Sequence, residues 1–309
     1  MLVCIVGPTA CYKSNTAIYL AEKLNGEIIS CDSVSVYKGL DIGSAKPTME
    51  ERGKVPHYMI DVVDPSDLSF SVSTYRTLAD AAIQLCLSNH KLPIVCGGSG
   101  LYFDAIMHDM KYACPSSSEI RESLSAAYDS DPTAFHSLLY NVDPITAGRI
   151  PIRDKKRLVR AMEVFQITGE PFSSFNQVYS EAQSTFRYDT VRIGLCLPRE
   201  HLYKRINERV DRMMQNGLLD EVVSLREQGL GISYPSMQSI GYKQLLMYLD
   251  GTYSLSTAIE EIKKASRHLA KRQITWFKRD PGITWFDCTE QDLAKTEIMN
   301  FVTKRLSNV

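Results

Sequence analysis

Residues 7–14 read Gly7-Pro8-Thr9-Ala10-Cys11-Tyr12-Lys13-Ser14, between the apolar run Leu2–Val6 and a helical pattern over Lys13–Asn25. The segment has the spacing of a phosphate-binding loop, G-x-x-x-x-G-K-[ST], with Tyr12 in place of the second glycine. In such loops, backbone N–H groups and the helix N-terminus face a phosphate, a lysine adds positive charge, and a hydroxyl reaches Mg²⁺. We therefore predict that residues 7–14 bind a phosphate group of a ligand, with Ser14 as the metal-binding residue.

Tyr12 is the departure from this pattern. If the loop needs left-handed backbone at position 12, a tyrosine costs about 1–2 kcal/mol there. We also expect its side chain to crowd a bound phosphate, so that Tyr12→Gly would lower the KM for a substrate that carries the phosphate. The alternative for residues 7–14 is an ordinary strand-to-helix turn.

Apolar runs typical of strands alternate with helical patterns at both ends of the chain, whereas residues 115 to about 187 show helical patterns alone. This alternation predicts an α/β fold, a mainly parallel sheet core with a helical insertion. The predicted domains are 1–114 with 187–309 for the core and C-terminal helices, and 115–186 for the insertion. The expected strands are Leu2–Val6, Glu27–Asp32, Leu92–Gly97, Val191–Leu197 and Ile283–Phe286; the expected helices are Lys13–Asn25, Thr74–Asn89, Ser118–Tyr128, Pro132–Tyr140, Pro144–Ile150, Lys155–Thr168, His201–Gln215, Leu218–Glu227, Ser239–Leu249 and about Ser256–Lys278.

Polar residues follow two of these strands, Asp32-Ser33 after one and Gly97-Gly98-Ser99-Gly100 after another. Ligands of parallel sheets bind at the carboxyl ends of strands, so we expect Asp32, Ser99 and the loop at 7–14 to converge. Taken singly, an aspartate at a strand end is more often a turn residue, and a GGSG sequence is more often a flexible turn.

The charge of the chain is balanced, with 35 Lys and Arg against 36 Asp and Glu. This excludes a protein that binds polyanions through bulk positive charge. The eight cysteines include no C-x-x-C pair, which favours reduced thiols over a metal cluster. We find no apolar stretch of membrane-spanning length and no signal-peptide pattern, so we expect a cytoplasmic protein.

Basic residues nevertheless gather in two short segments, six between Arg149 and Arg160 and seven between Lys263 and Arg279. Lys263, Arg267 and Lys271 would form a stripe along one helix, and Trp276 and Phe277 lie beside it. A solvated helix face is the usual meaning of one such run. Two runs favour a surface that binds a nucleic-acid backbone.

Together these segments resemble the tRNA dimethylallyltransferase (tRNA isopentenyltransferase) family, in family order and over about residues 3–280. The family fold implied by the resemblance is a P-loop, nucleotide-kinase-like core with a helical insertion. The matching segments are GPTACYKS at 7–14, DSVSVY at 32–37, GSAKP at 43–47, PHYMID at 56–61, GGSGLY at 97–102, RDKKRLVRAMEV at 153–164, IGYK at 240–243 and RHLAKRQITWFK at 267–278.

The resemblance implies transfer of a dimethylallyl group from dimethylallyl diphosphate to N6 of adenosine 37, next to the tRNA anticodon, by a cytoplasmic monomer that uses Mg²⁺. It implies that Asp32 is the base, that Lys13 and Ser14 with Mg²⁺ hold the diphosphate, and that Ser99 and Arg121 assist. The insertion is expected to contact the tRNA anticodon stem-loop. The residues implied to contact tRNA are Asp32, Ser33, Val34, Ser35, Ser99, Arg121, Lys156, Arg157, Leu158, Val159, Arg160, Gly241, Tyr242, Lys271, Arg272, Gln273 and Trp276.

The sequence departs from the family pattern at four positions: Cys11 replaces Ser, Tyr12 replaces Gly, Ser35 replaces Gln and Arg153 replaces Asn. These departures touch both expected substrates and leave a second hypothesis open, a related protein that binds tRNA and is catalytically weak or silent. A P-loop small-molecule kinase and an adenylate prenyltransferase are further alternatives.

Overall fold

A computed structural model describes residues 1–114, 117–175 and 186–307. The chain divides into two compact units, residues 1–106 with 188–309 and residues 107–187. Residues 115–116 and 176–185 of the predicted insertion lie outside the described residues.

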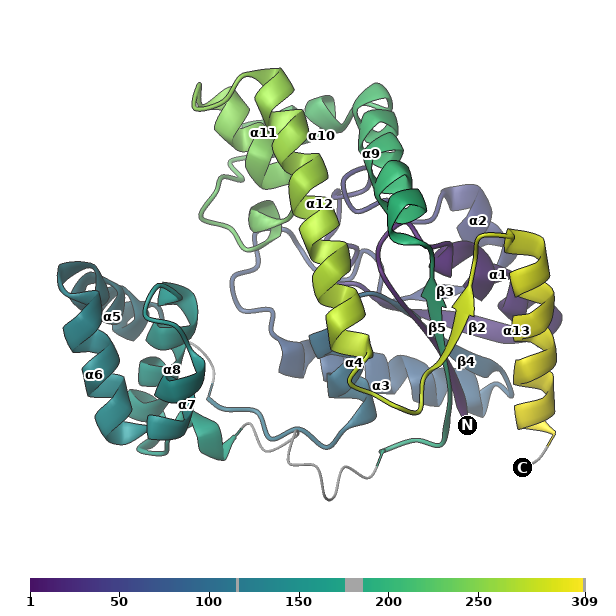
Figure 1. Cartoon of the computed structure of the whole chain (residues 1–309), viewed down its shortest axis with the longest axis horizontal. Helices are drawn as coiled ribbons and strands as arrows, with labels where there is room; N and C mark the ends of the chain where they lie inside the picture. Colours follow the sequence, from purple (N-terminus) through teal and green to yellow (C-terminus); the bar gives the residue numbers. More distant parts are fainter. Residues whose placement is uncertain (115–116, 176–185, 308–309) are drawn as a thin grey trace. The chain divides into compact units, whose positions relative to one another are not determined.

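The first unit is built on one six-stranded sheet in which every neighbouring pair is parallel. The spatial order is β3-β2-β4-β1-β5-β6, so β4 lies between β1 and β2, and β5 and β6 extend the sheet on the other side of β1 (Figure 1). The strands are β1 (Leu2–Val6), β2 (Gly26–Cys31), β3 (His57–Tyr58), β4 (Leu92–Gly97), β5 (Thr190–Cys196) and β6 (Thr284–Asp287).

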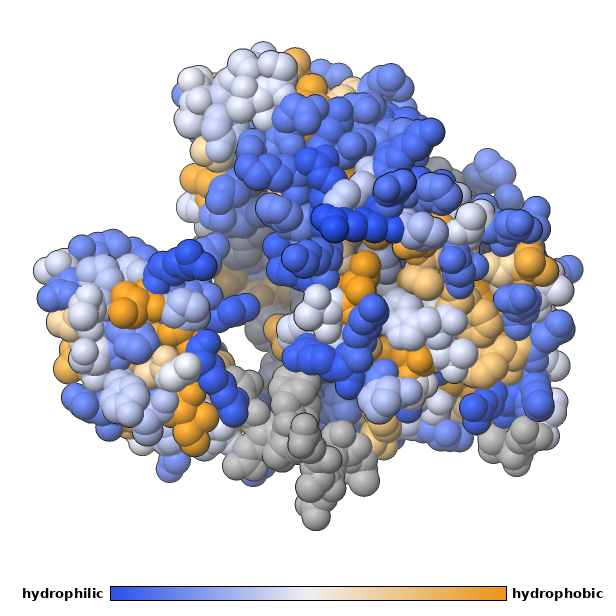
Figure 2. Space-filling model, viewed as in Figure 1, coloured by the Kyte–Doolittle hydropathy of each residue, from blue (hydrophilic) through white to orange (hydrophobic). Residues whose placement is uncertain are grey.

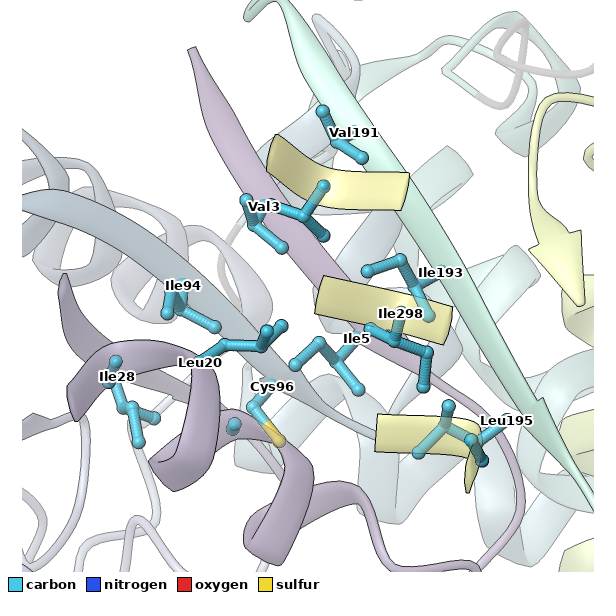
Figure 3. Close-up of a cluster of buried hydrophobic side chains, with 14 of the residues drawn as sticks. Val3, Ile5, Leu20, Ile28, Ile94, Cys96, Val191, Ile193, Leu195 and Ile298 are labelled. Carbon is cyan, nitrogen blue, oxygen red and sulfur yellow. The ribbon is translucent and has the colours of Figure 1, made fainter. Parts of the chain in front are cut away.

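One face of the sheet is covered by α1 (Lys13–Lys23) and α13 (Gln291–Leu306), which also contact each other. Alternate residues of the central strands, among them Ile5 and Ile193, point into this layer. Leu20 of α1 and Ile298 of α13 are fully buried against them, as Figure 3 shows. The apolar burial of this layer fixes the direction in which the loop between β1 and α1 leaves the sheet.

The opposite face receives α3 (Val72–Ser88), which packs on β2 and β4. Tyr75 of this helix is fully buried, and its hydroxyl donates to the carbonyl of Ser30 at 2.9 Å. Its ring stacks on Tyr102 of α4 (Gly100–Met107), with ring centroids 3.8 Å apart. The sheet is therefore covered by helices on both faces, which explains why its strands are apolar on both sides.

Helices that follow β5 complete the unit, and the longest, α12, packs along α9 and α11. A short helix, α2, begins at a capping box in which Thr48 and Glu51 satisfy each other's backbone N–H groups. The bounds of α2 are Met49–Lys54, and the helices after β5 are α9 (Arg199–Gln215), α10 (Leu218–Glu227), η3 (Ser236–Gln238), α11 (Tyr242–Leu249) and α12 (Leu255–Phe277).

The second unit is helical and has its own core, in which Phe135, Leu139 and Leu158 are buried. Its helices start at strong caps: Asp131 and Asp143 each accept backbone N–H bonds and each precede a proline in the first turn. The helices are α5 (Ser118–Ser130), α6 (Pro132–Val142), α7 (Pro144–Arg149), α8 (Lys155–Thr168) and η1 (Phe172–Ser174).

The predicted fold class, a parallel α/β core with a helical insertion, is confirmed. All five expected strands are present, and the sequence analysis missed β3, α2, α4 and α13. The helix expected from Ser239 starts at Tyr242 instead, because Gly241 adopts φ 98° and breaks the helical path. None of the described helices is long and apolar enough to cross a membrane.

Candidate active site

The loop at residues 7–14 connects β1 to α1, as the sequence predicts. Tyr12 precedes the helix and provides no side-chain cap, so the N–H groups of the first turn of α1 receive no capping acceptor from it. The Lys13 Nζ donates to the carbonyl of Pro8 at 2.6 Å, which bends the lysine back over its own loop. Free N–H groups beside a lysine suit an anionic ligand.

Asp32 stands at the carboxyl end of β2. Its Oδ1 accepts hydrogen bonds from the backbone N–H groups of Val34 at 2.8 Å and Ser35 at 3.2 Å. Its Oδ2 has no hydrogen-bond or ion-pair partner among the described residues. One oxygen therefore fixes the carboxylate, and the other remains available to accept a proton.

Ser99, after β4, supports the turn that holds Asp32. Its hydroxyl accepts the Ser33 N–H at 2.9 Å and lies 3.2 Å from the Ser33 hydroxyl. The structure thus brings Ser99 and Asp32 to one edge of the sheet. Ser35 is buried, and its hydroxyl lies 3.0 Å from that of Ser30.

A cavity of about 450 Å³ in the first unit joins these elements. Its walls include Lys13, Asp32 and Gln273, together with Arg205 and Arg209 of α9. The sequence analysis missed both arginines. Their signal was available: they are spaced i, i+4 on the helix that follows β5, and so lie together near the carboxyl end of that strand.

Burial lowers the pKa of Lys13, and Asp32 and two buried thiols partly oppose this shift. Burial likewise lowers the pKa of the Arg209 guanidinium, and the charge of Asp32 acts in the opposite direction. Both groups are therefore cations that have lost much of their hydration and gain from an anionic ligand.

Tyr12 adopts φ 60°, so the condition for backbone strain at this position is met. Its ring lies under the guanidinium of Arg205, with 3.7 Å between Cζ and the ring centroid, and its hydroxyl accepts from Arg205. Such a stack stabilises by about 0.5–2 kcal/mol, which is comparable with the roughly 1–2 kcal/mol of strain. The contact offsets the cost of a tyrosine at a position where the common loop pattern has glycine.

Gln273 of α12 connects the two loops of the site. Its side-chain oxygen accepts the Thr9 N–H at 2.8 Å, and its Nε2 donates to the Gly98 carbonyl at 3.0 Å. A Cβ on Gly98 would lie 2.3 Å from this nitrogen, and one on Gly100 would lie 2.3 Å from Trp276 Cδ1. Gly98 and Gly100 therefore permit close packing of α12, so the segment does not serve merely as a flexible turn.

Comparison with known proteins shows to which family the chain belongs. A family model described as IPP transferase matches residues 35–280. The chain belongs to the IPP transferase family. It is 42% identical to the tRNA dimethylallyltransferase of Halalkalibacterium halodurans and 41% identical to that of Bacillus subtilis, covering 99% of this chain and 97% of each relative.

Solved structures agree. A full-length tRNA isopentenylpyrophosphate transferase from Bacillus halodurans aligns over 99% of this chain and 97% of its own, with TM-score 0.73 and 41% identity. A eukaryotic dimethylallyltransferase, described as acting on tRNA, aligns over 99% of this chain and 79% of its own, with TM-score 0.82 and 28% identity. The resemblance inferred from the motifs is confirmed, and this chain is a transferase of the IPP transferase family.

The basic stripe on α12 is less open than this transferase's sequence suggests. Lys263 pairs with Asp211 at 2.9 Å and with Glu260 at 3.1 Å, and Arg267 donates to Asn207 at 2.6 Å. The stripe is therefore engaged by α9 at these two positions, because α9 packs on α12 and supplies acceptors. Lys271 stays exposed, as does Arg272. Hydrophilic residues dominate the visible surface over α9 and α12 (Figure 2).

Two further residues expected to contact tRNA lie at the start of α11. Tyr242 is fully buried, and its hydroxyl donates to Glu221 Oε1 at 2.6 Å. A Cβ on Gly43 would lie 2.5 Å from the Tyr242 ring, so this tyrosine packs directly on the GSAKP segment. Gly241 provides the φ 98° that this packing needs.

In the helical unit, a buried carboxylate holds two of the expected arginines. Glu163 is fully buried and accepts from Arg121 NH2 at 2.7 Å and from Arg160 NH1 at 2.8 Å. Leu158 and Val159 are buried in the core of the unit, so their side chains are not available to RNA in this structure. Their helix presents Lys156 and Arg157 to solvent instead.

Among the described residues, no group of three or more His, Cys, Asp or Glu side chains could hold a metal ion. Mg²⁺ commonly takes most of its ligands from phosphate oxygens and water and few from protein. Ser14 is exposed at the start of α1, where a hydroxyl could complete such a set.

Proposed function

We propose that this transferase moves a dimethylallyl group from dimethylallyl diphosphate to N6 of adenosine 37 in tRNA, giving N6-dimethylallyladenosine. The observation that carries the proposal is the shared cavity, which Asp32 lines together with Lys13 and Arg209. The homologues that bear the name tRNA dimethylallyltransferase support the choice of substrates.

The reaction needs a proton acceptor, because the lone pair of the adenine amine is delocalised into the ring and the amine is a poor nucleophile. In the proposed step, the new bond forms between N6 and the first carbon of the dimethylallyl group. The bond between that carbon and the diphosphate oxygen breaks, and diphosphate leaves with its electron pair. The proton lost from N6 passes to Asp32 Oδ2, while Oδ1 stays fixed by the N–H groups of Val34 and Ser35.

The leaving group needs positive charge, and the cavity contains it. Lys13 and Arg209 are assigned to the diphosphate oxygens, together with the first-turn N–H groups of α1. Ser14 is assigned to Mg²⁺, which would offset negative charge on the departing diphosphate when bound. Ser99 acts through the turn at Asp32, whose backbone it holds.

The adenine must leave the anticodon stack to enter a cavity of this kind. We assign backbone contacts to Lys271 and Arg272 on α12 and to Lys156, Arg157 and Arg121 on the helical unit, all of them charged and at least partly exposed. Arg160 within α8 and Trp276 near the end of α12 complete this set. We further propose that the protein acts as a cytoplasmic monomer on the tRNA anticodon stem-loop.

A second candidate is a tRNA-binding protein that is catalytically weak or silent. Ser35, where the family usually has Gln, is turned inward onto Ser30 and offers no long amide to a substrate base. A kinase or an adenylate prenyltransferase would need the same cavity. Neither would need the exposed basic residues of α12 to bind its substrates.

Incubation of the protein with Mg²⁺, dimethylallyl diphosphate and unmodified tRNA that reads U-starting codons tests these candidates. We expect the tRNA nucleosides to gain one dimethylallyl group by mass, and a tRNA with guanosine at position 37 to gain none. Intact tRNA binding without product would support the silent protein. Modification of free AMP in preference to tRNA would support the adenylate enzyme.

A further inference from the structure

The phosphate-binding loop contains two non-glycine residues in the left-handed region, Ala10 at φ 63° and Tyr12 at φ 60°. Neither position has the glycine that would adopt this backbone without strain. The loop's own glycine, Gly7, is used elsewhere: a Cβ there would lie 2.5 Å from the Leu195 carbonyl oxygen. Contacts from outside the loop must therefore maintain its shape.

One side chain makes those contacts at both positions. The Nε of Arg205 donates to the Ala10 carbonyl at 3.0 Å, and its NH1 donates to the Tyr12 hydroxyl. The same guanidinium lies over the Tyr12 ring, with 3.7 Å from Cζ to the ring centroid. We call this set of contacts the Tyr12–Arg205 bracket.

The bracket leaves part of Arg205 unused. A guanidinium has five N–H donors, and these bonds use two of them, so three remain without a partner among the described residues. Arg205 lines the same cavity as Lys13 and Arg209. Its free donors thus border the volume assigned to the diphosphate, and a planar guanidinium matches two phosphate oxygens at once.

We propose that Tyr12 is a positioning residue that holds Arg205 as a phosphate-binding cation of the diphosphate site. The inference rests on the proposed function for the identity of the ligand. The Tyr12 ring supports the Arg205 guanidinium, which adds positive charge beside the phosphate-binding loop. This loop lacks the second glycine of the common pattern. This proposal predicts the opposite of the crowding expectation, because removal of the Tyr12 ring would release the Arg205 cation.

Binding of inorganic diphosphate in the presence of Mg²⁺, measured by calorimetry, tests the bracket without requiring tRNA or transfer. We expect Tyr12→Asn, which tolerates left-handed backbone but removes the platform, to weaken diphosphate binding about tenfold. Arg205→Ala should weaken it by a similar factor. The double variant should lose little more than either single variant, because both changes remove the same contact. Arg199→Ala is the matched control, since Arg199 stacks on Tyr203 of the same helix and does not line the cavity.

Tyr12→Phe keeps the ring and should retain most of the affinity, which separates the stack from the hydroxyl bond. Additive losses in the double variant would overturn the proposal, as would tighter diphosphate binding by Tyr12→Gly or Tyr12→Asn. A wild-type protein that binds no diphosphate would overturn it too. If diphosphate binds as expected and no tRNA product forms, the proposed function fails while the bracket stands.

Discussion

The side-chain oxygen of Gln273 accepts the backbone N–H of Thr9 at 2.8 Å, and this bond ties α12 to the phosphate-binding loop. The same amide donates to Gly98 at 3.0 Å. Gln273 is followed along α12 by Trp276 and preceded by the exposed Lys271 and Arg272. The helix that we assign to RNA contact is therefore hydrogen-bonded to both loops of the cavity.

Replacing Gln273 should weaken both the fold and diphosphate binding. Gln273→Leu leaves a backbone N–H and a carbonyl without partners, which costs about 1–3 kcal/mol in the free energy of unfolding. We expect a matching fall in a urea unfolding midpoint and a higher KM for dimethylallyl diphosphate. Gln273→Glu can still accept from Thr9 and should restore part of the KM. An unchanged KM in both variants would show that the loop keeps its shape without α12.

Close packing of α12 on the segment after β4 predicts a strong effect at Gly100. A Cβ there would lie 2.3 Å from Trp276, so Gly100→Ala should destabilise the protein by about 1–3 kcal/mol. Gly53→Ala is the matched control: Gly53 lies in α2 with nothing within 4 Å of a new Cβ, and alanine should stabilise by about 0.5–1 kcal/mol. Equal effects of the two changes on the thermal midpoint would contradict this packing.

The buried carboxylate of the helical unit predicts a pH-dependent stability. Burial alone raises the pKa of Glu163, but hydrogen bonds from Arg160 and Arg121 outweigh it and hold the pKa below its ordinary value of 4.5. A lowered pKa means that stability is present above the unfolded value and is lost as pH falls through the folded value. Glu163→Gln should lose about 3 kcal/mol at pH 7. Its unfolding free energy should then fall less than that of wild type between pH 7 and pH 3, and a parallel decline would refute this role.

The exposed end of the α12 basic run predicts the salt dependence of tRNA binding. Lys271→Ala and Arg272→Ala should each weaken binding and reduce the slope of log affinity against log salt by about 1. Lys263→Ala is the control on the same helix, because Lys263 is already paired with Asp211 and Glu260. A slope that changes as much for Lys263 as for Lys271 would place the RNA elsewhere.

The parallel core could be predicted because its strands are continuous apolar runs and its first loop has a motif with fixed spacing. The two-residue strand β3 could not be predicted, because His57 and Tyr58 show no apolar periodicity. Its only sign is its pairing with β2 in the folded structure. The helix α13 was missed because its apolar residues form only a weak stripe over Gln291–Leu306.

The site was predictable where side chains follow strands directly, as at Asp32 and Ser99. Arg205 and Arg209 were not found because α9 carries many charged residues along its length, which is the pattern of a helix face exposed to solvent. Only the folded structure shows that the Arg205 guanidinium lies over the Tyr12 ring. The sequence also could not show that Lys263 and Arg267 are engaged by α9, because their acceptors lie more than fifty residues away along the chain.

The most direct test compares wild type with Asp32→Asn, which keeps the acceptor that binds the Val34 N–H and removes the basic carboxylate. Under single-turnover conditions with saturating tRNA and dimethylallyl diphosphate, we expect the rate of dimethylallyladenosine formation to fall about 10²–10⁴-fold. The dissociation constant for tRNA should stay within about twofold, since no charge on the RNA-binding helix changes. A variant that transfers at the wild-type rate, or that loses tRNA affinity as much as it loses rate, would contradict the assignment of Asp32 as the base of a tRNA-modifying transferase.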